Sequence, residues 1–120
     1  MAALHILAVD DEPAFLELIR EHLSDRYEVE TAAFATEAVR ALEARRPELL
    51  LLDINMPGVD GLTLFRFLRK LDITIPVIVI TGNQSSAMAE QFLRDGAFAY
   101  APKPLNLGYL DHLVAAAIGP

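Results

Sequence analysis

The sequence predicts an α/β fold in which a parallel sheet is covered by helices on both faces. Along its 120 residues, short apolar runs alternate with longer segments of helical period, which is the pattern of repeated strand-helix units. Several of the short runs are apolar at every position, as expected for strands buried on both faces. Acidic or other polar residues follow these runs, at the sheet edge where parallel α/β folds place their ligand crevice.

Five segments have the length and composition of strands. They lie at Leu4–Val9, Tyr27–Ala32, Leu49–Asp53, Val77–Thr81 and Phe98–Ala101. Each of them is followed by a segment long enough to form a helix, so the coarse reading is five βα units.

The first two helices have recognisable starts. Pro13 is expected to open the first, which runs to about Ser24. Thr36 is expected to cap the second helix, which ends before Pro47. The residues expected to face inward are Phe15, Leu16, Leu18, Ile19 and Leu23 in the first helix and Val39 and Leu42 in the second.

Polar residues with N-cap preferences precede the other three helical segments. Asp60 is expected to cap the third helix, Ser85 or Ser86 the fourth, and Asn106 a fifth helix over about Leu107–Ala117. No repeat, low-complexity segment or linker is visible. One domain over residues 1–120 therefore accounts for the sequence.

Composition restricts the function classes. The chain has no cysteine and a net charge of -7, which argues against thiolate metal sites, disulfides and direct contact with nucleic acid or an anionic membrane. No apolar run approaches the ~20 residues of a membrane span, and the N-terminus lacks the basic flank of a signal peptide. We expect a cytoplasmic protein.

Three acids stand at the ends of two apolar runs. Asp10 and Asp11 follow the first run, and Asp53 ends the third. If those strands are neighbours, the carboxylates converge and repel one another unless a cation lies between them. The cluster is therefore either a hard-metal site or a group of strongly perturbed pKa values.

The other strand ends add polar groups to the same rim. Asp53 leads into a turn rich in proline and glycine, which leaves its carboxylate accessible. Thr81 and Gly82 end the fourth strand, and Lys103 and Pro104 follow the fifth. Gly82 permits close approach of its backbone N–H to a ligand.

In this order and at these spacings, the strand-end residues resemble the receiver domain of two-component response regulators, of the chemotaxis-regulator type. The resemblance spans essentially the whole chain and extends to Asn55–Gly58, Asp60–Gly61, Asp95–Ala97 and the aromatic Tyr100. It implies a three-layer, doubly wound (βα)5 flavodoxin-like sandwich. The five-stranded parallel sheet would have the order 2-1-3-4-5.

The resemblance also implies the chemistry of the strand ends. Asp53 would be the phosphoacceptor, taking a phosphoryl group from a phosphohistidine. Asp11 would bind Mg²⁺ directly and Asp10 through a water. Asp53 and the backbone carbonyl of Asn55 would complete the protein ligands of the metal. The chain would not be an enzyme beyond its own phosphorylation from a phosphodonor and its autodephosphorylation.

Phosphate binding and output are implied in the same way. Lys103 would pair with Asp53 and then with phosphoryl oxygens, helped by backbone N–H groups near Gly82 and Asn55. Thr81 would follow the phosphate inward and Tyr100 would follow Thr81. This would change the surface of the fourth helix, fifth strand and fifth helix. The Lys103–Pro104 peptide bond is expected to be cis.

The resemblance implies a sensor histidine kinase or a histidine phosphotransfer protein as phosphodonor. The output partner would be an effector domain or a downstream protein, and the output face could also form a homodimer. The sequence fits both a stand-alone receiver and one excised from a longer regulator.

Each assignment has a simpler competitor. Glu12 fits an acid at a helix N-terminus, favoured by the macrodipole. Asp60, Asp95 and Asp111 fit caps or turns, Phe98 a contact surface or a buried side chain, and Tyr100 a half-buried core aromatic. The histidines are spaced unlike metal ligands: His5 fits the first strand, and His22 and His112 fit helix surfaces.

Two other function classes were weighed. One is a pseudo-receiver, an interaction module that never accepts phosphate. The other is an aspartate-nucleophile phosphatase of the haloacid dehalogenase type. That family has a second aspartate two residues after the nucleophile, where this chain has Asn55, so phosphatase activity on small esters is disfavoured.

Overall fold

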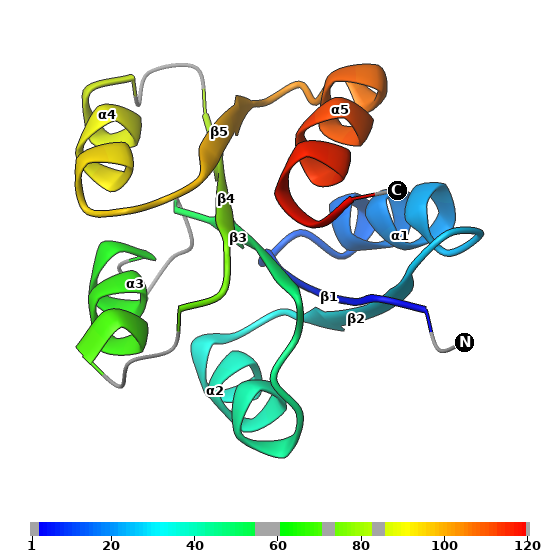
Figure 1. Ribbon diagram of the computed structural model, residues 1–120, viewed down its shortest axis with the longest axis horizontal. Helices are drawn as coiled ribbons and strands as arrows, with labels where there is room; N and C mark the ends of the chain where they lie inside the picture. The colour runs from blue at the N-terminus through cyan, green and yellow to red at the C-terminus, as the bar shows by residue number, and fades with distance from the viewer. Residues whose placement is uncertain (1–2, 55–60, 71–73, 83–85, 120) are drawn as a thin grey trace.

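The computed structural model describes residues 3–54, 61–70, 74–82 and 86–119. Five strands and five helices alternate along these parts of the chain (Figure 1). The strands are β1 (His5–Val9), β2 (Glu28–Ala32), β3 (Leu49–Asp53), β4 (Val77–Thr81) and β5 (Ala99–Pro102). The helices are α1 (Pro13–Leu23), α2 (Ala35–Ala44), α3 (Gly61–Lys70), α4 (Ser86–Arg94) and α5 (Leu107–Ile118).

All strand pairs are parallel, and the sheet has the order β2-β1-β3-β4-β5. The fold class and the strand order are as predicted. The register places Leu7 of β1 beside Leu50 of β3, and Leu51 of β3 beside Ile78 of β4. Each strand ends within about a residue of its predicted end, so the residues after the strands gather at one edge.

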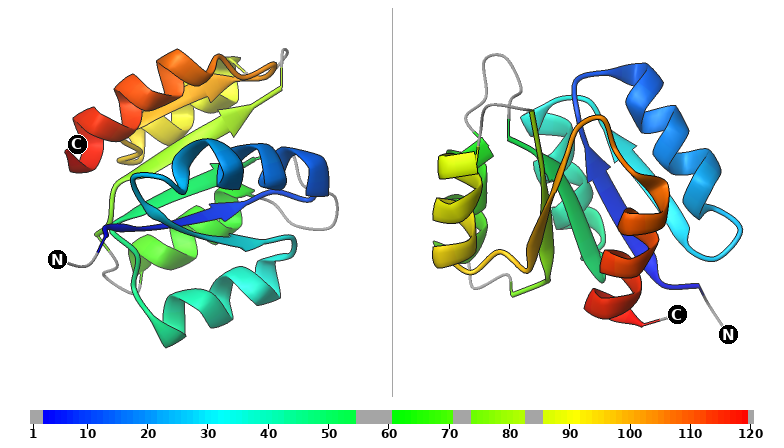
Figure 2. Two further views of the ribbon diagram at one scale, coloured as in Figure 1. Left: turned by 90° about the vertical axis from the view of Figure 1, so that its right-hand side faces the viewer. Right: turned by 90° about the horizontal axis from the view of Figure 1, so that it is seen from above.

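Helices cover both faces of the sheet. In Figure 2, α1 and α5 lie on one side and α2, α3 and α4 on the other. Every residue of β1, β3 and β4 is buried, because these three strands lie inside the sheet with helices on both faces. Strand β2, at the edge, instead has exposed and half-buried residues.

Helix α1 begins at Pro13, as predicted, with Glu12 at the N-cap position. Leu16, Ile19 and Leu23 are buried, and their spacing of three and four residues places them on one helix face. The prediction that Leu18 faces inward was wrong, since it is 42% exposed. Leu18 lies about 200° around the helix from Leu16, away from that face.

The predicted cap of α2 was wrong, and that of α5 was confirmed. Helix α2 has Phe34 at its N-cap, so Thr36 lies inside the helix. Glu37 reaches back to accept a hydrogen bond from the backbone N–H of Ala33 at 3.1 Å, and no Thr36 cap is formed. Asn106 accepts a hydrogen bond from the backbone N–H of Tyr109 at 2.9 Å. Helix α4 begins at Ser86 itself; Asp60 and Ser85 lie outside the described residues.

Asp111 joins two helices and is neither a cap nor a turn residue, which corrects the prediction. It lies within α5, and its Oδ1 is 2.8 Å from both Arg26 Nη2 and His22 Nε2. Spacing along the chain could not reveal this contact, because α1 and α5 meet only through packing on the same face of the sheet. His22 is accordingly half-buried.

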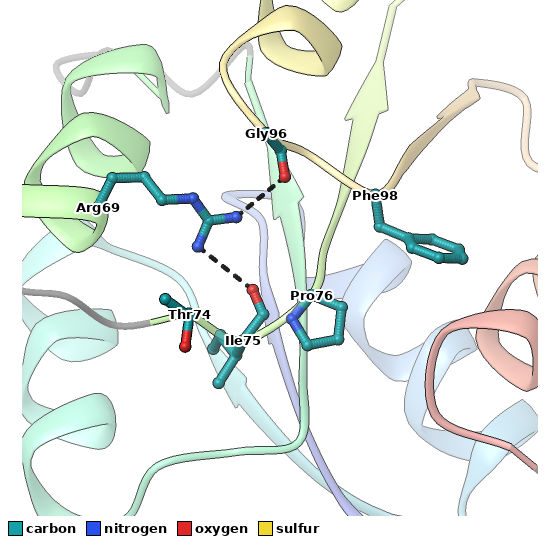
Figure 3. Close-up of a pocket in the computed structure, with 6 residues that line it drawn as sticks. All are labelled: Arg69, Thr74, Ile75, Pro76, Gly96 and Phe98. Carbon is teal, nitrogen blue, oxygen red and sulfur yellow. Dashed lines mark hydrogen bonds between the residues drawn. The ribbon is translucent and has the colours of Figure 1, made fainter.

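A second contact ties the other helical layer to the sheet at the end remote from the acidic residues. The Arg69 guanidinium donates hydrogen bonds to the backbone carbonyls of Ile75 and Gly96 at 3.4 and 3.2 Å (Figure 3). It also lies 4.6 Å from the ring of Phe65. These groups border a hollow of about 350 Å³ that is also lined by Thr74, Pro76 and Phe98.

Within the described residues, no helix is long and apolar enough to cross a bilayer.

Candidate functional site

The predicted acidic and polar residues meet at the carboxyl edge of the sheet. Asp10, Asp53 and Thr81 follow or end β1, β3 and β4, and are only 1%, 2% and 3% exposed. The backbone N–H of Asp10 donates to the Ala32 carbonyl at 3.1 Å, which extends the pairing of β1 with β2. These polar side chains are therefore fixed by strands, in an environment otherwise formed by apolar core. The prediction that the Asp53 carboxylate is accessible was wrong for this structure, because the end of β3 is itself buried.

The acids at the end of β1 form a cluster with one unpredicted member. The carboxylates of Asp10, Asp11 and Glu12 each place an oxygen within 4.8 Å of the others. The Glu12 backbone N–H donates to Asp10 Oδ1 at 2.9 Å. Glu12 does stand at the helix N-terminus, as predicted, but its carboxylate also belongs to this pocket. Its position directly after Asp10 and Asp11 was the available sequence signal.

Lys103 carries a positive charge into the same pocket. Its backbone N–H donates to the Thr81 carbonyl at 2.7 Å, and the Lys103–Pro104 peptide bond is cis. Its Nζ lies 2.9 Å from Asp10 Oδ2 and 3.8 Å from Asp53 Oδ2. The predicted partner Asp53 is thus within reach, but the shorter contact is with Asp10.

The surroundings of Asp10 favour its protonated form. Burial is the main reason that the pKa of Asp10 rises from 3.8 to about 6, and the nearby Asp53 charge adds to the rise. The Glu12 N–H and the Lys103 ammonium act in the opposite direction. For Lys103, burial would lower the pKa, but Glu12 and Asp10 outweigh it and raise the pKa above its usual value. Each charge in this pocket therefore depends on its neighbours.

The acidic cluster has the donor set of a hard divalent cation. Asp10 Oδ2 is buried, and its ion pair with Lys103 lacks the alignment of a hydrogen bond. Asp11 beside it is only half-buried, so it can reach solvent. Carboxylate oxygens with access to water are the protein ligands that Mg²⁺ prefers. The predicted backbone ligand, Asn55, lies outside the described residues.

Thr81 and Tyr100 lie on the same face of the sheet. Thr81 pairs in register with Pro102, and Tyr100 stands two residues before Pro102 on β5, beside Val79. Because side chains alternate along a strand, Thr81 and Tyr100 are diagonal neighbours on one face. Tyr100 is 36% exposed and Phe98 is 44% exposed, so the alternative that Phe98 is simply buried was wrong. Gly82 follows Thr81 at the same rim.

A family model described as the response regulator receiver domain matches residues 6–115. The chain belongs to the response regulator receiver family. The match runs from Ile6 in β1 through the other four strands and into α5, so it includes the acidic pocket and Lys103. The predicted resemblance is confirmed.

Relatives of this receiver domain include transcriptional regulators and solved receiver domains. It is 40% identical over 105 residues to the response regulator MprA of Mycobacterium leprae, covering 87% of this chain and 46% of MprA. It is 36% identical over 117 residues to the C4-dicarboxylate transport transcriptional regulatory protein DctD of Rhizobium meliloti, covering 97% of this chain and 25% of DctD. The receiver domain thus spans less than half of either relative.

The structure of the receiver domain of NtrX from Brucella abortus is similar over nearly its whole length. The TM-score is 0.89 at 34% identity, and the alignment covers 94% of this chain and 97% of that one. At this similarity the two chains share the receiver fold over nearly their whole lengths. The chain is therefore a receiver domain of two-component signalling.

Proposed function

We propose that residues 1–120 form one receiver domain in which Asp53 accepts a phosphoryl group from a phosphohistidine. One observation carries the proposal. Asp53 is buried at the end of β3, with the Lys103 ammonium 3.8 Å from its Oδ2 and the acids of β1 at the same edge. This is an acceptor oxygen, a fixed positive charge and a metal-binding donor set in one pocket.

Each described residue has a part in the transfer. An Asp53 carboxylate oxygen attacks phosphorus, the bond from phosphorus to the imidazole nitrogen breaks, and the electron pair leaves with the imidazole. Lys103 neutralises charge on the phosphoryl oxygens, and the Gly82 backbone N–H binds one of them. Asp11 and Asp53 would hold Mg²⁺ directly and Asp10 would hold it through a water, and the family resemblance adds the Asn55 carbonyl; the bound ion would neutralise the remaining charge. Positioning and charge neutralisation supply most of the catalysis in such reactions.

The labelling experiment uses a small phosphodonor in place of the kinase. Incubation of the receiver with acetyl phosphate and Mg²⁺ is expected to add one phosphoryl group, seen as a single shifted species by intact mass. Excess EDTA is expected to suppress the labelling, because the acids and phosphate would then repel one another without a cation. Absence of labelling with active donor and Mg²⁺ would favour the pseudo-receiver, and steady release of phosphate from small esters would favour the phosphatase.

The output proposal concerns Thr81 and Tyr100. The phosphoryl group would draw the Thr81 hydroxyl inward, and Tyr100, already on the same sheet face, would move into the vacated space. A local charge would thereby bias a two-state surface formed by α4, β5 and α5.

Tyr100→Ala should uncouple phosphorylation from this surface. In the wild type, phosphorylation is expected to change hydrogen exchange in α4 and β5. In Tyr100→Ala the label should still form, because Tyr100 is not at the acidic pocket, while the exchange change should be largely lost. Phe98→Ala serves as a matched control, since Phe98 is a comparably exposed aromatic beside β5. An exchange change as large in Tyr100→Ala as in the wild type would refute the switch role.

The partners follow from the length of the relatives. Since this receiver spans 46% of MprA and 25% of DctD, we propose that it controls an effector domain or a downstream protein. Its phosphodonor would be a sensor histidine kinase or a histidine phosphotransfer protein. The α4-β5-α5 face would transmit the signal and could join two receivers as a dimer.

A further inference from the structure

Lys103 is held on the Asp10 side of the acidic pocket, away from Asp53. Its Nζ lies 2.7 Å from Glu12 Oε1 and 2.9 Å from Asp10 Oδ2, against 3.8 Å from Asp53 Oδ2. The ring of Phe15, on the first turn of α1, lies 4.4 Å from the same ammonium. Three groups from the end of β1 and the start of α1 therefore surround the lysine, although its proposed role is at Asp53.

Glu12 is oriented for this contact. It occupies the N-cap of α1, yet its side chain makes no cap hydrogen bond. Its backbone N–H is fixed on Asp10 Oδ1 at 2.9 Å, and its carboxylate accepts a hydrogen bond from Lys103 Nζ. The backbone of Glu12 thus sets its place beside Asp10, and its carboxylate is turned toward the lysine.

The lysine lies against a buried oxygen of Asp10, the acid that would help to hold the cation through a water. Asp10 Oδ2 is the buried carboxylate oxygen without an aligned hydrogen bond, and it faces Lys103 Nζ. Two cations beside one oxygen repel each other strongly when the pocket is partly shielded from water. A divalent cation that binds Asp10 must therefore weaken the hold of Asp10 on the lysine.

We propose that Glu12 is a positioning residue that retains Lys103 beside Asp10, so that the lysine and the divalent cation compete for Asp10. The strength of the contact between Glu12 and Lys103 then determines how easily the cation displaces Lys103 from Asp10. Once displaced, Lys103 can move to Asp53. This inference rests on the proposed function, because release of Lys103 matters only if Asp53 accepts a phosphoryl group. It makes Glu12 a determinant of metal affinity that acts through another side chain.

A double-mutant cycle on Mg²⁺ binding tests the inference without any phosphodonor. Mg²⁺ is titrated into the wild type, Glu12→Gln, Lys103→Met and the double variant, and backbone amide NMR shifts give each dissociation constant. In the Lys103→Met background, Glu12→Gln only removes a negative charge and should weaken binding. With Lys103 present, Glu12→Gln also loosens the hold on Lys103, which competes with Mg²⁺ for Asp10. The loss of Mg²⁺ affinity should therefore be smaller, or become a gain. We expect the two effects to differ by about threefold or more.

A conservative variant keeps the inference testable if Lys103→Met does not fold. Glu12→Asp retains the charge and draws the carboxylate away from the lysine, so it should tighten Mg²⁺ binding. The matched control is Glu17→Gln, which removes the same charge from an exposed site on α1 where the described residues record no ion pair. With Lys103 present, Glu17→Gln should not tighten Mg²⁺ binding, in contrast to Glu12→Asp.

The outcomes separate this inference from the proposed function. Equal effects of Glu12→Gln in both backgrounds, or weaker Mg²⁺ binding in Glu12→Asp, would overturn the positioning role alone. If the double-mutant cycle shows the expected coupling but the wild type takes no label from acetyl phosphate, the proposed function alone is overturned. A wild type that binds no Mg²⁺ would overturn both.

Discussion

Asp53→Asn is expected to abolish labelling of the receiver by acetyl phosphate. The amide has nearly the same shape as the carboxylate, so the buried position at the end of β3 should be retained. Its oxygen, however, carries no charge and is a much weaker nucleophile toward phosphorus. Intact-mass analysis after incubation with donor and Mg²⁺ should show the unmodified mass only.

The control for Asp53→Asn is Asp25→Asn. Asp25 has a side chain that is 76% exposed and lies 3.6 Å from Arg26, far from the acidic pocket. This variant should be labelled as fully as the wild type. Equal labelling of Asp53→Asn and Asp25→Asn would show that another group accepts the phosphoryl, and the assignment of Asp53 would fail.

Asp10→Asn is expected to stabilise the metal-free receiver above pH 7. Folding raises the pKa of Asp10 from 3.8 to about 6, chiefly by burial, so the folded state binds more protons than the unfolded state between these values. The free energy of unfolding therefore falls as pH rises from about 4 to about 6 and stays low above that, by about 3 kcal/mol in total. This cost is a net value that already includes the favourable contact of Asp10 with Lys103. Asparagine removes the cost but leaves the Lys103 ammonium with one carboxylate fewer, so the expected gain is about 1 to 3 kcal/mol.

Urea unfolding in EDTA across this pH range measures the effect. The wild type should lose stability between about pH 4 and pH 6 relative to Asp10→Asn, and the difference should then level off. The exposed Asp25→Asn should follow the wild type to within about 0.5 kcal/mol. If Asp10→Asn were less stable than the wild type at pH 7.5, the contact with Lys103 would outweigh the burial of the charge. Added Mg²⁺ should reduce the difference in free energy of unfolding between Asp10→Asn and the wild type, because it stabilises the wild type preferentially.

The sequence was sufficient to predict the features that depend on local pattern. The apolar runs before Asp10, Asp53 and Thr81 specify buried strands, because a strand with helices on both faces has no polar side. Once these strands are parallel neighbours, their carboxyl ends must meet. The acidic pocket was therefore predictable from the strand ends together with the strand order. The order of the strands came from the family resemblance.

The features that escaped prediction depend on contacts between distant segments. The predicted inner face of α1 wrongly included Leu18, because hydrophobicity alone does not set the rotation of a helix against its sheet. Asp111 has a cap-like composition but meets Arg26 and His22 only when α1 and α5 share a face. Glu12 was interpreted through its own helix, whereas its partner, Lys103, is 91 residues away.

The hydrogen bonds of Arg69 have a mechanical consequence for the receiver. They join the end of α3 to the strand entrance at Ile75 and to Gly96, the positive-φ glycine just after α4. The C-terminal end of α4 is thereby anchored at the side of the sheet remote from Asp53. A movement of α4 that keeps these bonds is a rotation about that anchored end, with the largest displacement at the N-terminal end of the helix, at Ser86. Arg69 would then act as the hinge point about which α4 rotates.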